Sequence, residues 1–240
     1  MITFAVGQYT FSLQENCIEA ICLFGSVARG DQDEKSDIDL LFIVDDKSGE
    51  DLLQFKRQLI ARLGVPDDWI SLYNQSMIDK MASNGSYFLW HIKLEAKIVY
   101  SKTGFLERVL RDLRQHVNAA DHLHEYLQIC DDIRRSINRD EWTTSYELNV
   151  LASLIRNTCI TWCYSVGVKM FSRVGPVKNR LDVLGVEAPF SIEEYNKLYK
   201  YRLAYSRSQT GSLPTPSKQE VIKWVERASY LICKALKEGD

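Results

Sequence analysis

The sequence lacks several features that would place the protein in a special structural class. No apolar run approaches the 18 residues that a membrane-spanning helix needs. Residues 1–16 lack the basic start and long apolar stretch of a secretory signal. The six cysteines include no CxxC pair, which argues against a zinc site or a disulfide framework. We therefore expect a cytoplasmic protein that does not interact with membranes.

Neither charge sign dominates. The chain carries 30 basic and 32 acidic side chains among 240 residues, and neither half has the strongly basic character of a nucleic-acid footprint. Hydrophobic residues make up 45% of the sequence, an ordinary value for a folded protein. The length is sufficient for two small domains, each with its own core.

The hydrophobic pattern changes near residue 104. Before this point, short strand-like runs alternate with helical ones, with strands expected over 18–24, 37–44, 69–73 and 98–100 and helices over 52–63, 77–81 and 87–94. After it, only helical periods occur, over 105–117, 119–138, 143–167, 176–184, 191–206 and 217–237. The pattern predicts an α+β fold with a mixed sheet in residues 1–103, followed by an all-helical bundle domain in residues 104–240.

The most informative stretch is LFGSVARGDQDEKSDIDLLFIV, residues 23–44. The spacing of Gly25 and Gly30 imitates a phosphate-binding P-loop, but Asp31 stands where that motif needs lysine, and an acid would repel a triphosphate. Gly25 allows close approach of the backbone to a ligand. Ser26 is a suitable N-cap for a short helix whose free N–H groups would favour a phosphate.

Two aspartates follow this loop at the start of an apolar strand. Asp37 and Asp39 are separated by one apolar residue, so on a strand their carboxylates point to the same face. Two neighbouring carboxylates repel each other unless a cation lies between them, and hard oxygen ligands near a phosphate suit Mg²⁺. A solvated acidic turn is the alternative, but these acids begin a core element, which favours a metal site.

The combination of GSVARGD with SDIDL resembles the nucleotidyltransferase superfamily that includes polymerase beta, the aminoglycoside nucleotidyltransferases and the minimal nucleotidyltransferases. The shared pattern is Gly-Ser, about ten residues, then Asp-x-Asp between hydrophobic residues, and the resemblance covers roughly residues 16–101. It implies that Gly25, Ser26 and Ser36 bind the nucleotide, while Asp37 and Asp39 hold one or two Mg²⁺ ions and are catalytic.

The resemblance implies transfer of a nucleoside monophosphate from a nucleoside triphosphate such as ATP to a hydroxyl. The acceptor would be a small, aminoglycoside-like molecule, a protein or an RNA. In such a reaction, positioning and electrostatic stabilisation carry most of the catalysis. The alternative is a degenerate nucleotidyltransferase that acts as a binding module, like an antitoxin.

One position departs from the family pattern. A third carboxylate often stands on a later strand, but the matching strand 69–73 has Ser71 at its centre, and Asp67 and Asp68 precede it out of register. A base could come instead from the helical domain, where Glu147 is the candidate. The competing interpretation, which we favour, is that Glu147 stabilises the start of its helix.

The helical domain loosely resembles the HEPN domains that accompany minimal nucleotidyltransferases. Their Arg-x₄₋₆-His motif is absent after Arg156, and the spacing of Arg111 and His116 is attributed to chance. His122 and His124 would not share a helix face, and His91 is interpreted as packing. The domain is expected to shape an acceptor pocket, and a homodimer is left open.

Overall fold

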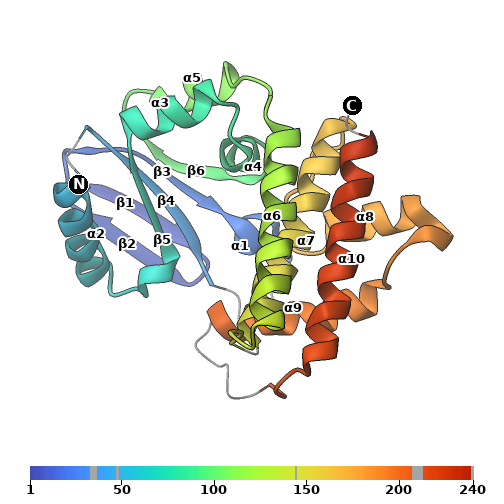
Figure 1. The fold of residues 1–240 in the computed structure, drawn as a ribbon. Coiled ribbons are helices and arrows are strands. Elements are labelled where there is room, and N and C mark those ends of the chain that lie inside the picture. Colours follow the sequence, from blue (N-terminus) through green and yellow to red (C-terminus); the bar gives the residue numbers. More distant parts are fainter. Residues whose placement is uncertain (33–36, 47–48, 144, 207–212, 239–240) are drawn as a thin grey trace. The chain divides into compact units, whose positions relative to one another are not determined.

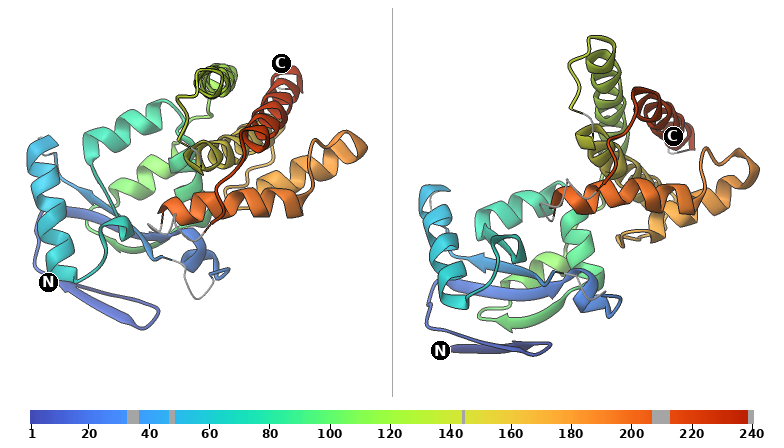
Figure 2. Two further views of the ribbon diagram at one scale, coloured as in Figure 1. Left: turned by 60° about the horizontal axis from the view of Figure 1, so that its bottom comes forward. Right: turned by 90° about the horizontal axis from the view of Figure 1, so that it is seen from below.

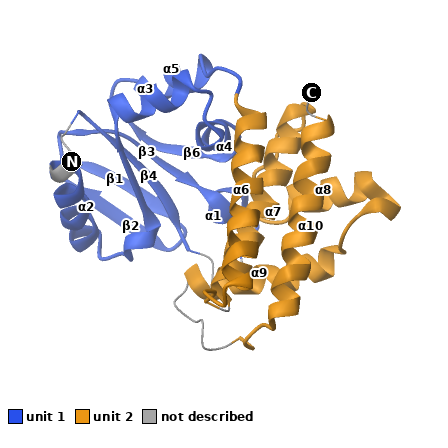
Figure 3. Ribbon diagram, viewed as in Figure 1, with its two compact units in different colours: residues 1–117 blue, residues 118–240 orange. Residues whose placement is uncertain are grey.

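The computed structural model describes residues 1–240 except 33–36, 47–48, 144, 207–212 and 239–240. The chain divides into two compact units, Met1–Val117 and Asn118–Asp240, coloured separately in Figure 3. The first contains every strand of the described residues, and the second contains only helices (Figure 1). The fold class expected from the sequence, α+β followed by an all-helical part, is confirmed.

Unit 1 is built on a four-stranded sheet with the order β5-β4-β3-β6. Strand β3 runs antiparallel to β4 and β6, while β4 and β5 are parallel, so the sheet is mixed. A separate antiparallel hairpin, β1–β2, precedes it. The strands are β1 (Ile2–Val6), β2 (Tyr9–Leu13), β3 (Ile18–Phe24), β4 (Asp39–Val44), β5 (Ile70–Asn74) and β6 (Lys97–Ser101).

Both faces of the sheet are covered, which explains why β3 is buried along its whole length. The hairpin and α2 (Gly49–Leu63) share a hydrophobic core with one face, formed by residues such as Phe4, Leu40, Phe42 and Leu59. On the other side of the sheet from the hairpin lie α3 (Gln75–Ser83), α4 (Tyr87–Glu95) and α5 (Phe105–Arg111), as Figure 2 shows. Residues that are buried on both faces read as a continuous apolar run rather than an alternating one.

The structure extends the sequence expectations for unit 1 in two places. The hairpin was not expected, although its inward residues alternate with exposed ones. Helix α5 ends at Arg111, before the expected 117, and the segment after it packs on α4: Trp90 Nε1 donates to the Arg114 carbonyl at 2.9 Å, and the His116 ring lies 4.0 Å from that of Tyr87. Residues 104–117 therefore belong to unit 1, whereas the expected domain boundary lay at 103/104.

Unit 2 is a bundle around α7 (Ser145–Ser165), which is buried on most of its surface. Contacts join α7 to α6 (Ala119–Asn138), α8 (Gly175–Leu184), α9 (Ile192–Ser206) and α10 (Lys218–Glu238). The fully buried Trp162 and Tyr195 anchor the core. Such an all-round apolar helix needs neighbours on every side, which accounts for the bundle. No described helix is both long and apolar enough to cross a membrane.

Candidate functional site

The candidate site lies at the end of the sheet where β3 leaves and β4 begins. The antiparallel register pairs Phe24, the last residue of β3, with Asp39, the first residue of β4. Helix α1 (Gly25–Arg29) starts immediately after Phe24. Asp37 is exposed, Ile38 is buried and Asp39 is half-buried, the alternation expected for two acids on one side of an extended segment. The sheet thus brings the glycine loop and the two aspartates together, as the sequence predicts.

Gly25 and Asp39 are in unusually close contact. The backbone of Gly25 has φ +71°, a conformation that residues with a side chain rarely adopt. A Cβ atom placed on Gly25 would lie 1.9 Å from Oδ2 of Asp39, so a side chain could not be accommodated without moving the carboxylate. Glycine is therefore required here for both backbone conformation and space.

The electrostatic environment of Asp39 is unfavourable for a carboxylate. Burial raises its pKa, and the negative charge of Asp37 raises it further, to about 6, although His91 and Arg29 act in the opposite direction. Because both main causes penalise the charged form, the site favours anything that brings positive charge to the two oxygens. A divalent cation would relieve both effects at once.

The structure corrects the expected role of Ser26. Helix α1 begins at Gly25 rather than after Ser26, and its N-cap position is Phe24, which makes no side-chain capping bond. Ser26 lies inside the helix and fixes its far end, because its carbonyl accepts hydrogen bonds from the N–H groups of Gly30 at 2.9 Å and Asp31 at 3.1 Å. Gly30, at φ +80°, closes the helix in the left-handed conformation common at helix ends.

A polar network behind the loop was missed by the sequence interpretation. Arg29 Nη1 donates to Glu95 Oε2 at 2.6 Å, and its Nε donates to Asp31 at 3.1 Å. His91 Nε2 lies 3.0 Å from the same oxygen of Glu95. Burial raises the pKa of the Glu95 carboxyl, but the hydrogen bonds from His91 and Arg29 outweigh it and lower the pKa overall.

The signal for this network was present in the sequence. His91 and Glu95 are four residues apart in a segment expected to be helical, so they share a face. The expectation that His91 serves in packing is only part of its role, because its ring contacts Phe24 and it also faces Glu95.

Strand β5 brings no carboxylate beside Asp39. The parallel register pairs Ser71 with Leu41, so Ser71 shares the face of Asp39 but stands two residues further along the sheet. Asp68, just before β5, is exposed, yet its charge contributes to the raised pKa of Asp39. Among the residues that the structure describes, no group of three or more His, Cys, Asp or Glu side chains could hold a metal.

The remaining residues predicted for the site lie elsewhere. Ser36 is outside the described residues. Glu147 lies in the first turn of α7 in unit 2, and its Oε1 accepts hydrogen bonds from the N–H of Thr143 at 2.7 Å and its hydroxyl at 3.2 Å. Arg111 is the last residue of α5 and pairs with Asp112, while His116 lies in the segment beyond that helix.

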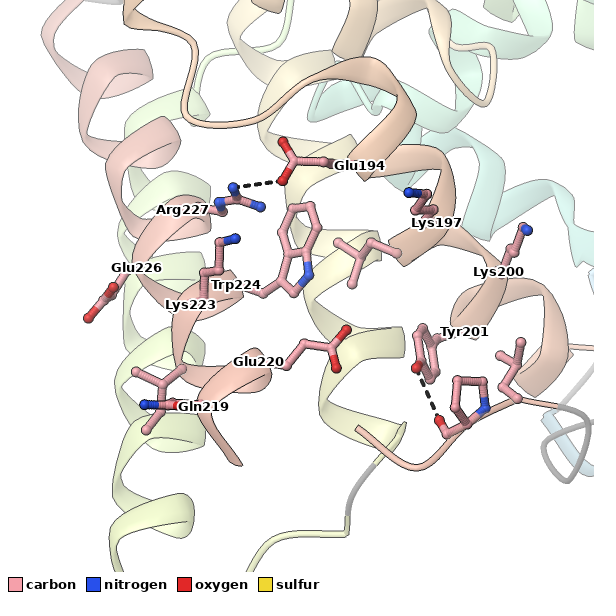
Figure 4. Close-up of a pocket in the computed structure, with 14 residues that line it drawn as sticks. Glu194, Lys197, Lys200, Tyr201, Gln219, Glu220, Lys223, Trp224, Glu226 and Arg227 are labelled. Carbon is pink, nitrogen blue, oxygen red and sulfur yellow. Dashed lines mark hydrogen bonds and ion pairs between the residues drawn. The ribbon is translucent and has the colours of Figure 1, made fainter. Parts of the chain in front are cut away.

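Unit 2 contains a separate cavity of about 940 Å³ between α9 and α10 (Figure 4). Buried Trp224 and Tyr201 line it together with charged residues of both signs, and Arg227 is paired with Glu194 at 2.8 Å. The charges at the wall do not select one ligand class, because three glutamates face three lysines and an arginine. None of the residues predicted for the site lines this cavity.

Comparisons with known proteins agree with the position of the site. Residues 10–104 match the family model described as polymerase beta, nucleotidyltransferase, a segment that includes β3, α1 and β4. No curated protein sequence matches the chain.

Two solved structures resemble the chain in part. One is a spectinomycin adenyltransferase, AAD(9), from Enterococcus faecialis with ATP and spectinomycin. It is 13% identical, with a TM-score of 0.48 over 91% of this chain and 93% of its own. The other is a toxin–antitoxin structure with AMP-PNP. It is 21% identical, with a TM-score of 0.30 over 50% of this chain and 89% of its own.

Proposed function

We propose that this protein, whose residues 10–104 belong to the polymerase beta family of nucleotidyltransferases, is a Mg²⁺-dependent enzyme that transfers a nucleoside monophosphate from a nucleoside triphosphate to a hydroxyl group. The observation that carries the proposal is the contact between Gly25 and the carboxylate of Asp39, with Asp37 beside them. A backbone without a side chain, next to two mutually repelling acids, is the arrangement that a metal-bound triphosphate requires.

The donor set fits Mg²⁺. Asp37 and Asp39 supply hard carboxylate oxygens, and the raised pKa of Asp39 reflects a negative charge that the protein itself leaves poorly compensated. Two protein carboxylates are an ordinary number for Mg²⁺, which keeps waters and binds substrate phosphates at its other positions. When bound, the ion supplies charge neutralisation at the phosphates and at the attacking oxygen.

The chain's own residues position the reactants. The Gly25–Ser26 backbone presents a surface on which phosphate oxygens can lie without meeting a side chain, and Ser36 is proposed to contribute to nucleotide binding. Asp37 and Asp39 hold the reacting end of the nucleotide against the sheet. The acceptor oxygen bonds to the α-phosphorus, the bond to the bridging oxygen breaks, and pyrophosphate leaves.

The hydroxyl proton needs a base, and two residues are candidates. Glu147 is the base proposed from the helical domain, and its Oε2 has no hydrogen-bond partner among the described residues. Its Oε1 is committed to Thr143, which supports the helix-start role instead. Asp68 lies close enough to affect the pKa of Asp39. A base acting near neutral pH contributes about 10²–10⁴-fold to the rate, so substitution separates these roles.

The acceptor is proposed to be a hydroxyl of a small aminoglycoside-like molecule, a protein or an RNA. The helical unit is proposed to contribute to its recognition.

The second candidate function is a binding module derived from a nucleotidyltransferase and acting like an antitoxin. Ser71 on β5, where the family often has a carboxylate, favours it. This alternative retains the fold and loses the transfer reaction.

Transfer of label from an α-³²P-labelled nucleoside triphosphate tests the proposal. Wild type, Asp37→Asn and Asp39→Asn are compared with Mg²⁺ and with chelator, each against aminoglycosides, the protein itself and total RNA. We expect transfer only by wild type with Mg²⁺. Label transfer that survives both substitutions contradicts the mechanism, and Mg²⁺-dependent nucleotide binding without transfer to any acceptor supports the binding module.

A further inference from the structure

Helix α4 contacts both ends of the loop that carries Gly25 and Ser26. Phe88, His91 and Glu95 lie at positions i, i+3 and i+7, on one face of this helix. The rings of Phe88 and His91 meet the ring of Phe24, the residue before Gly25, edge to face at 5.7 and 5.8 Å. Glu95 binds Arg29, the last residue of α1.

The contact between Arg29 and Glu95 is more than a surface ion pair. The two side chains are only 20% and 16% exposed, and Nη1 lies 2.6 Å from Oε2. The same carboxylate faces His91, so its position is defined from two sides. Partly buried, charge-assisted hydrogen bonds of this kind are stronger and more directional than those of exposed pairs.

The loop itself has little to hold it in place. Helix α1 has five residues, begins at a glycine with positive φ and makes no side-chain capping bond. An isolated helix of this length does not persist in water. Its geometry, and with it the position of the Gly25 backbone against Asp39, must therefore depend on contacts from outside the loop.

We infer that Arg29, Glu95 and His91 are positioning residues that clamp the Gly25–Arg29 loop to α4 and so hold the nucleotide phosphates in register with Asp37 and Asp39. The inference rests on the proposed function for its nucleotide part, whereas the clamp itself is a property of the protein alone. It assigns a role to Arg29 beyond helix termination and to His91 beyond packing.

Hydrogen exchange on the ligand-free protein tests the clamp. The amides of Gly30 and Asp31 report on the loop, because both donate to the Ser26 carbonyl. In Arg29→Gln and Glu95→Gln we expect these amides to exchange about tenfold faster, with α2 unchanged, since loss of a tether raises local opening without global unfolding. The matched control is the pair between Arg62 and Glu15 in the same unit, whose Gln variants should leave the loop unaffected.

Nucleotide kinetics test the positioning role. We expect Arg29→Gln and Glu95→Gln each to raise the KM for the nucleoside triphosphate about tenfold, with kcat at saturation changed less than about threefold, because the loop binds phosphates before chemistry. The double variant should be no worse than either single variant, since both break one coupled interaction. Arg29→Lys should recover part of the loss.

Each result leads to a decision. Loop amides that exchange at the wild-type rate in both variants overturn the clamp. Faster exchange with unchanged KM overturns its role in positioning the nucleotide. Binding measured with Mg²⁺ and AMP-PNP separates this inference from the proposed function: if wild type does not bind, the proposed function and the positioning role fail, while the exchange data still decide whether the clamp exists.

Discussion

Asp39 in unit 1 and Glu147 in unit 2 are both acids at the start of a secondary-structure element, and their surroundings are opposite. Asp39 is half-buried beside a second carboxylate, and its pKa is raised to about 6. Glu147 is buried at 6% exposure and accepts two hydrogen bonds from Thr143. An acid that faces donors stabilises the fold, whereas an acid that faces another acid costs stability unless a cation binds.

The largest expected effect concerns the two aspartates. Asp37→Asn and Asp39→Asn should each lower kcat for nucleotide transfer about 10³-fold, because neutral amides no longer hold the cation that stabilises the transferring phosphate. Steady-state kinetics with labelled nucleotide measures this, and Asp79→Asn on an exposed face of α3 serves as the control. A drop in the control as large as in the variants would mean that charge in general, rather than this site, is responsible.

The next effect separates strain from function at glycine. Gly7 and Gly25 both have positive φ, but a Cβ on Gly7 would meet nothing within 4 Å, whereas one on Gly25 would collide with Asp39. Both Ala variants should lose about 1 kcal/mol of unfolding free energy from the left-handed backbone. Only Gly25→Ala should also lose Mg²⁺-dependent nucleotide binding. Denaturant unfolding and calorimetry measure the two quantities, and equal nucleotide affinity in both variants would argue against phosphate binding at this loop.

Glu147 is expected to behave as a structural acid. Glu147→Gln should cost about 1–2 kcal/mol of stability through weakened hydrogen bonds to Thr143, and kcat should remain within about twofold of wild type. Urea denaturation and label transfer provide the two readouts. The comparison breaks if kcat instead falls 100-fold or more while stability holds, because Glu147 would then act as the base, and Asp68→Asn is the variant to measure beside it.

The smallest effect is the pH dependence of stability. Folding raises the pKa of Asp39 from 3.8 to about 6, so the folded protein binds this proton more tightly than the unfolded chain. The stabilisation is fully present below pH 3.8 and is lost as the pH rises through about 6. In metal-free buffer, Asp39→Asn should therefore gain in Tm relative to wild type between pH 4 and pH 7, as thermal unfolding would show. A constant difference would mean that the carboxylate is well compensated.

Local patterns were sufficient for much of the fold and for the centre of the site. Apolar periodicity predicted the buried strands 18–24 and 37–44 and the long helices of unit 2, because packing on every side leaves a continuous apolar signal. The spacing of Gly25, Asp37 and Asp39 predicted their meeting, since it requires only one loop between two paired strands.

Features that depend on distant residues could not be predicted. The contact of Arg29 with Glu95 spans 66 residues and needs the register of α4 on the sheet. The N-cap role expected for Ser26 was wrong because Gly25, with its positive φ, starts the helix one residue earlier. Likewise, the β1–β2 hairpin takes part in a core formed with α2 and the sheet, which no local window contains.

Calorimetric titration of Mg²⁺ with a non-hydrolysable nucleoside triphosphate tests the central claim most directly. Wild type, Asp39→Asn and Glu147→Gln are compared with and without chelator at pH 7.5. We predict binding by wild type and Glu147→Gln that disappears with chelator, and no binding by Asp39→Asn. Binding that is equal in all three proteins, or indifferent to Mg²⁺, would contradict a metal–nucleotide site at Gly25 and Asp39.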